Sequence, residues 1–211
     1  MKSAAILLED GTLIPAESIG SDSITVGEIV FNTSMTGYQE IMTDPSYNNQ
    51  IITFTHPHIG NTGINKDDFE SDAHGCSGII MRNNPTIESS WRKSNGFIEF
   101  LKDKSISAVC SVDTRYLTSL LREKGSINGC IVPNIEKIDE AKSLLSDFPG
   151  LSNLDLAIKV TTKNEYPWSE GTHELINLKN NEERKNLNIY VYDYGIKKNI
   201  LRILYDLGCN I

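Results

Sequence analysis

The sequence has no apolar run long enough to cross a membrane as a helix, which takes about 20 consecutive apolar residues. Its first apolar stretch, Ala4–Leu8, is interrupted by Glu9 and Asp10, and no segment resembling a cleavage site follows. We therefore predict a first β-strand here, in place of a signal or transit peptide, and no membrane partner.

Cysteines are few, and none of them form a Cys-x-x-Cys pair. The four, which are widely and unevenly spaced, are Cys76, Cys110, Cys130 and Cys209. Zinc knuckles and dithiol redox sites need closely spaced pairs, so neither is predicted. We expect reduced, mostly buried thiols in a cytoplasmic protein.

Basic residues are in the minority, with 20 Lys and Arg against 28 Asp and Glu and a formal net charge of −8. A protein that tracks nucleic-acid phosphates needs a basic stripe, whereas the lysines and arginines here are dispersed. Nucleic acid is therefore not an expected partner. With 39% hydrophobic residues among 211, the chain can bury one core, or one domain plus part of another.

Short apolar runs bounded by turn residues fill the first half of the chain and predict β-strands. Asp10-Gly11 lies between the first two runs and predicts a hairpin, because glycine tolerates a positive φ. The predicted strands are Ala4–Leu8, Thr12–Ala16, Thr25–Asn32, Gln50–Thr55, Gly78–Met81, Ala108–Val112 and Gly129–Val132.

Helical periodicity is confined to fewer segments. Asp113 can cap a helix over Thr114–Lys124 that ends at Gly125. A second apolar stripe runs over Ile138–Leu145, and a shorter helix is predicted near Phe97–Leu101. This mixture of strands and helices predicts an α/β domain over residues 1–162.

Residues 163–186 are polar and charged, a composition typical of a linker. Beyond them, Leu187–Tyr192 is predicted as a strand and Lys197–Leu207 as a helix ending at Gly208, while Asn210-Ile211 could begin another strand. One βα unit cannot cover both faces of its strand. We therefore expect residues 187–211 to be the start of a truncated second domain. The alternative is that this unit packs as an appendage on the first domain.

Five ordered segments together resemble the small subunit of glutamine-dependent carbamoyl phosphate synthetase, in its amino-terminal portion. They are Gly27–Tyr47, His56–Gly63, Asp113–Gly125, Asn128–Cys130 and Tyr192–Arg202. The resemblance implies a β/β/α domain of the swivelling type that docks on the large synthetase subunit. It further implies that residues 187–211 are the first βα unit of a flavodoxin-like class I glutamine amidotransferase domain.

The resemblance also implies a reaction and a set of partners. A Cys-His-Glu triad in the small subunit of this family releases ammonia from glutamine. The ammonia then reaches the large subunit, which makes carbamoyl phosphate from bicarbonate and ATP for arginine and pyrimidine synthesis. ATP and Mg are expected in the large subunit only, with no cofactor in this one. The implied assembly is a heterodimer or an oligomer of heterodimers.

One site residue follows from the resemblance, namely Ser46, which matches the serine that reaches the bound glutamine. Asp44-Pro45 initiates a turn that would present Ser46 at a loop tip, although a plain turn serine is the alternative. The candidates for contact with a partner are Thr36, Tyr38 and Gln39, which precede Ser46, and Arg115, which follows it. The alternatives are an inward-packed Tyr38 and, for Asp113–Arg115, a simple helix cap.

No catalytic residue is predicted. His74-Gly75-Cys76-Ser77-Gly78 resembles a nucleophile turn, but its glycine spacing differs from Gly-x-Cys-x-Gly and a strand follows in place of a helix. Cys76 is therefore predicted to be structural. Two alternative functions remain open, a phosphohistidine carrier using His74 and a metal hydrolase using His56, His58 and Asp72. Proline between the two histidines disfavours the metal site.

Overall fold

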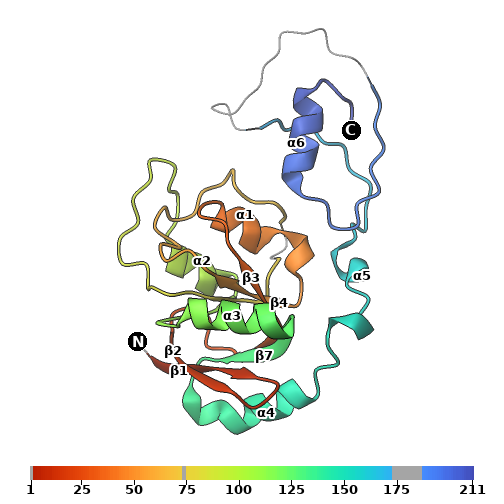
Figure 1. Cartoon of the computed structure of the whole chain (residues 1–211). Coiled ribbons are helices and arrows are strands. Elements are labelled where there is room, and N and C mark those ends of the chain that lie inside the picture. The colour runs from red at the N-terminus through yellow and green to blue at the C-terminus, as the bar shows by residue number, and fades with distance from the viewer. Residues whose placement is uncertain (1, 73–74, 173–186) are drawn as a thin grey trace.

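The computed structural model describes residues 2–72, 75–172 and 187–211. Seven strands of this part of the chain close into a barrel in the order β1-β2-β6-β5-β4-β3-β7 (Figure 1). β3, β4, β5 and β6 run parallel, and the other neighbours are antiparallel. The strands are β1 (Lys2–Leu8), β2 (Leu13–Ser18), β3 (Thr25–Asn32), β4 (Gln50–Phe54), β5 (Gly78–Ile80), β6 (Ser107–Cys110) and β7 (Ile127–Val132).

The barrel interior is filled by alternate residues of every strand, as the two-residue period of a strand requires. In β1, Ala4, Ile6 and Leu8 join the cluster to which all seven strands contribute, while Leu7 packs in a different cluster with α4 (Ile138–Ser146). The short apolar runs bounded by turn residues predict all seven strands to within about two residues. They do not predict closure, because closure depends on pairs such as β2–β6 that lie far apart in the chain.

Helices cover the barrel from outside. Figure 1 shows α1 (Tyr38–Thr43) and α2 (Phe97–Asp103) on one side and α4 on the opposite side. α3 (Thr114–Lys124) contributes Leu117 and Leu121 to the interior cluster. The helix prediction for Thr114–Lys124 is confirmed, as is its cap, because an Asp113 carboxylate oxygen accepts the Tyr116 N–H at 3.0 Å.

After α4 the chain leaves the barrel through short turns and approaches α6 (Lys198–Asp206), which stands apart in Figure 1. These turns are η3 (Leu151–Asn153) and α5 (Ala157–Val160). A further short 3-10 helix, η2 (Ile135–Lys137), precedes α4. The predicted end of α6 is confirmed by Gly208, which has a φ of 84°. No helix among the described residues is long and apolar enough to cross a membrane.

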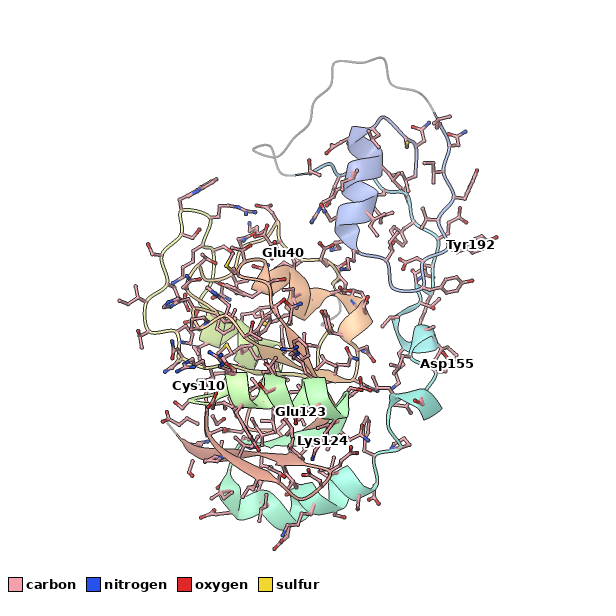
Figure 2. The ribbon with its side chains drawn as sticks, viewed as in Figure 1. Glu40, Cys110, Glu123, Lys124, Asp155 and Tyr192 are labelled. Atoms are coloured by element: carbon pink, nitrogen blue, oxygen red, sulfur yellow. The ribbon has the colours of Figure 1, made fainter. Side chains whose placement is uncertain are left out.

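The predicted strand over Leu187–Tyr192 is wrong in extent. Among the residues that the structure describes, this segment forms a single parallel bridge, between Asn188 and Asn210. A strand without neighbours leaves its backbone groups to water. Accordingly Tyr190 and Tyr192 are 87% and 84% exposed, and Tyr192 lies on the outer side of this segment (Figure 2). Within the predicted linker, residues 163–172 form a loop, and residues 173–186 lie outside the described part of the chain.

Candidate functional site

The corner after α1 presents the predicted site residue. Asp44 follows α1 and caps the short 3-10 helix η1 (Pro45–Tyr47) by accepting the backbone N–H of Ser46 at 2.9 Å. Pro45 is buried, whereas Ser46 is exposed. The prediction that Asp44-Pro45 starts a turn with Ser46 at its tip is therefore confirmed. Its contact with glutamine stays a prediction.

Asp44 also joins this turn to the start of α6. Its second carboxylate oxygen lies 2.6 Å from Nζ of Lys197, which precedes the helix. The Asp44 side chain is only 6% exposed, so this ion pair is better shielded from water than a surface pair. The hydrogen bond to Asp44 raises the pKa of Lys197.

The first turn of α6 is held by Glu70, a residue that sequence reasoning missed. The Glu70 carbonyl accepts the Lys198 N–H at 2.9 Å, and the Glu70 carboxylate accepts the Asn199 N–H at 3.0 Å. The side chain of Lys197, at the N-cap position, makes no capping hydrogen bond. The side chain of the next residue, Lys198, forms an ion pair with Asp72. The one signal in the sequence was a helix start that lacked a capping residue.

A turn at Asp193 leads into α6. One carboxylate oxygen of Asp193 accepts the N–H groups of Gly195 and Ile196, both at 2.9 Å, and the other accepts the hydroxyl of Tyr166 at 2.6 Å. Burial opposes the charge on Asp193, but these three hydrogen bonds outweigh it and lower the pKa of the carboxyl. Burial and the same carboxylate raise the pKa of Tyr166 to about 12.

These elements border a cavity of ≈ 950 Å³, open to solvent, between the barrel and the C-terminal segment. Its walls come from η1, from the segment around Glu70, and from the residues beside α6, including Pro45, Tyr166, Asp193 and Leu201. Both polar and apolar side chains line it. Pro45, Glu70 and Lys198 line this one space, and Ser46 follows Pro45 without being a lining residue itself. Ligand sites favour such positions between two structural units.

The predicted partner contacts divide into two groups. Thr36 and Arg115 are exposed, so they remain available to a partner. Tyr38 is 6% exposed, with its ring edge-on to Phe97 and its hydroxyl donating to the Gly63 carbonyl at 2.7 Å. Gln39 is 3% exposed. The interface prediction is corrected for these two, because buried side chains present no surface to a partner.

Gln39 is occupied within the chain. Its side-chain amide donates to the Asn65 carbonyl at 2.7 Å and accepts the Asn65 N–H at 3.0 Å. This is the pair of hydrogen bonds that a residue of an adjacent β-strand would make with Asn65. Such a pair satisfies the backbone of a loop that would otherwise be buried without partners. The role of Gln39 is therefore to fix the loop around Asn65 against α1.

The cysteines are structural, as predicted. Cys76 has no exposed surface, and burial raises the pKa of its thiol to about 12. Such a thiol is protonated and inert at neutral pH. Cys110, Cys130 and Cys209 are also buried, and all four are free.

The two alternative functions gain no support. The imidazole rings of His56 and His58 pack edge to face with their centroids 5.7 Å apart. The described residues contain no group of three or more His, Cys, Asp or Glu side chains that could hold a metal ion. Asp72 pairs with Lys198. His74, the candidate phosphohistidine, lies outside the described residues.

Comparison with known proteins gives the family. Residues 6–131, nearly the whole barrel, match the family described as carbamoyl-phosphate synthase small chain, CPSase domain. The full chain is 47% identical over 215 residues to the carbamoyl phosphate synthase small chain of Vibrio vulnificus (strain YJ016), covering 56% of that protein. It is 49% identical over 216 residues to that of Yersinia pseudotuberculosis serotype I (strain IP32953), covering 55% of it.

The closed barrel with its appended helices defines a mixed α/β domain. The chain belongs to the carbamoyl phosphate synthase small-chain family, and it spans little more than half the length of these curated relatives. Among solved structures, an aminopeptidase from Aneurinibacillus sp. strain AM-1 matches 62% of this chain and 30% of its own with 20% identity. Its TM-score of 0.35 is too low to establish a common fold.

Proposed function

We propose that this chain works in the small, glutamine-handling subunit of carbamoyl phosphate synthase. In this proposal the small subunit releases ammonia from glutamine, and the large subunit combines it with bicarbonate and ATP to give carbamoyl phosphate. The observation that carries the proposal is the match to carbamoyl phosphate synthase small chains over the whole chain at 47% identity. ATP and Mg belong to the large subunit, and the complex is cytoplasmic.

The proposed organisation has three parts. Residues 1–162 form the swivelling β/β/α-type domain that docks on the large subunit, where exposed Thr36 and Arg115 are contact candidates. Residues 163–186 are the linker, and residues 187–211 form the first βα unit of a flavodoxin-like amidotransferase domain. Support comes from an apolar stripe along α6 and its C-cap residue, of which Ile200 is 49%, Ile203 45% and Leu207 61% exposed. Parallel sheets bury such stripes.

Within this function we propose that Ser46 contacts the bound glutamine. The support is geometric. Ser46 is exposed on a turn ordered by Asp44, and Pro45, the residue before it, lines the cavity beside α6. A hydroxyl at this position can donate to or accept from the polar groups of an amino-acid substrate. The remainder of the pocket would come from the amidotransferase domain.

The experiment combines the complete small chain with the large chain and supplies either glutamine or ammonia. We expect glutamine to support carbamoyl phosphate synthesis only when the small chain is present, whereas ammonia supports synthesis with the large chain alone. Equal rates from glutamine with and without the small chain would contradict the proposal.

The 211 residues alone are expected to release no ammonia from glutamine. The reason is that every cysteine among them is buried, and amide hydrolysis by a thiol needs an accessible thiolate beside a base. Ammonia release that the substitution Cys76→Ser abolishes would overturn this expectation. The measurement is a coupled ammonia assay on the purified 211-residue chain.

A further inference from the structure

We propose that Glu70 is a positioning residue for glutamine binding, because it fixes the start of α6 against the turn that presents Ser46. This inference rests on the function proposed above. Its starting point is that α6 lacks a capping side chain of its own, while two N–H groups of its first turn bond to Glu70. The cap therefore comes from a segment that lies 129 residues away in the chain.

Glu70 is itself anchored to the corner that carries Ser46. Its backbone N–H donates to the hydroxyl of Thr43 at 3.0 Å, and Thr43 is the last residue of α1. The next residue, Asp44, caps the turn of Ser46. The Thr43 hydroxyl in turn donates to the Gln39 carbonyl at 2.9 Å, which fixes its orientation. One residue thus has its backbone tied to the Ser46 corner and its carboxylate tied to α6.

The charge of Glu70 suits this position. Glu70 is 7% exposed, and the N-terminus of a helix carries partial positive charge that favours a carboxylate. The two lysines that begin this segment are engaged elsewhere, Lys197 with Asp44 and Lys198 with Asp72. The carboxylate accepts the Asn199 N–H and the Glu70 carbonyl accepts the Lys198 N–H, so the side chain and the backbone of Glu70 together cap α6, and the nearby charge of Lys197 also favours the carboxylate.

The consequence for binding is geometric. Glu70 and Lys198 both line the cavity, as does Pro45 beside Ser46. If the cap is lost, the first turn of α6 frays and that wall of the cavity moves relative to Ser46. A pocket built from two structural units binds well only when both walls are held in place.

The test uses Glu70→Ala and Glu70→Gln in the complete small chain assembled with the large chain. We expect Glu70→Ala to raise the KM for glutamine roughly tenfold, the loss expected for one charge-assisted hydrogen bond. Glu70→Gln keeps an accepting oxygen and loses the charge, so we expect roughly a threefold rise. The rate with ammonia should stay unchanged. Hydrogen exchange should speed up in the first turn of α6.

Asp113→Ala is the matched control, because it also removes one carboxylate cap, at α3, which contributes no residue to the lining of the cavity. It should speed exchange in α3 and leave the KM for glutamine unchanged. Faster exchange in α6 without a rise in KM would overturn the proposal, since Glu70 would then be only a structural cap. An equal fall in the glutamine and ammonia rates would overturn it as well.

Ser46→Ala separates this inference from the proposed function. If Ser46→Ala raises the KM for glutamine and both Glu70 variants do not, only the role of Glu70 is rejected. If Glu70→Ala raises the KM and Ser46→Ala does not, the positioning role stands and the glutamine contact of Ser46 is rejected. If glutamine supports no synthesis even with the unaltered small chain, the proposed function itself fails.

Discussion

Replacing Phe97 by alanine is expected to lower the free energy of unfolding by about 3–5 kcal/mol, as for other fully buried aromatic side chains. Phe97 has no exposed surface and begins α2. Its ring meets Tyr38 edge to face with centroids 5.4 Å apart, which joins α2 to α1 on the outer side of the barrel. Alanine would leave a cavity and remove the support of the corner that precedes Ser46.

Chemical denaturation followed by circular dichroism measures this effect. Phe97→Leu should cost clearly less, because it keeps most of the buried apolar surface. Ile98→Ala is the neighbouring control, since Ile98 is only partly buried against the same cluster. A loss below about 1 kcal/mol for Phe97→Ala would contradict the packing described here, because that is the scale of ordinary substitutions.

Gly75→Ala is expected to cost about 1–3 kcal/mol or more, the range for overpacking a dense interior. A Cβ at Gly75 would overlap the carbonyl oxygen of Asp44, and would lie 2.6 Å from its carbonyl carbon and 2.8 Å from its nitrogen. Backbone atoms cannot relieve such an overlap by rotating about a side-chain bond, so the chain itself would have to shift. Since Asp44 caps the turn of Ser46, we also expect a higher KM for glutamine in the complete complex.

Gly96→Ala is the matched glycine control for this substitution. A Cβ there would meet only the side chain of Glu99, whose carboxylate oxygen at 3.1 Å can rotate away. Thermal unfolding of the two variants should therefore differ, with Gly75→Ala melting at the lower temperature. Equal melting temperatures would show that the Gly75 segment does not press against Asp44.

Local signals predicted most of the barrel domain. The strand Thr25–Asn32 and the helix Thr114–Lys124 match the structure at both ends. For the strand, the apolar run and its flanking turn residues set the limits, and for the helix the cap Asp113 and the stop Gly125 set them. Each of these signals lies within a few residues of the element that it defines.

The failed and missed predictions depend on contacts between distant segments. Leu187–Tyr192 has the composition of a strand, but among the described residues it forms only one β-bridge, from Asn188 to Asn210. Tyr38 lies in a polar segment and is buried because Phe97 lies beside it in the fold. The Glu70 cap could not be predicted either, because no sequence pattern connects a loop glutamate to a helix 129 residues further along the chain.

The central claim is that the Ser46 hydroxyl contacts the bound glutamine in the proposed carbamoyl phosphate synthase. The most direct measurement is the KM for glutamine of Ser46→Ala in the complete small chain bound to the large chain. We predict a KM raised roughly tenfold, the value of one lost hydrogen bond to a charged substrate, with the ammonia-dependent rate unchanged. An unchanged KM for glutamine would contradict the claim.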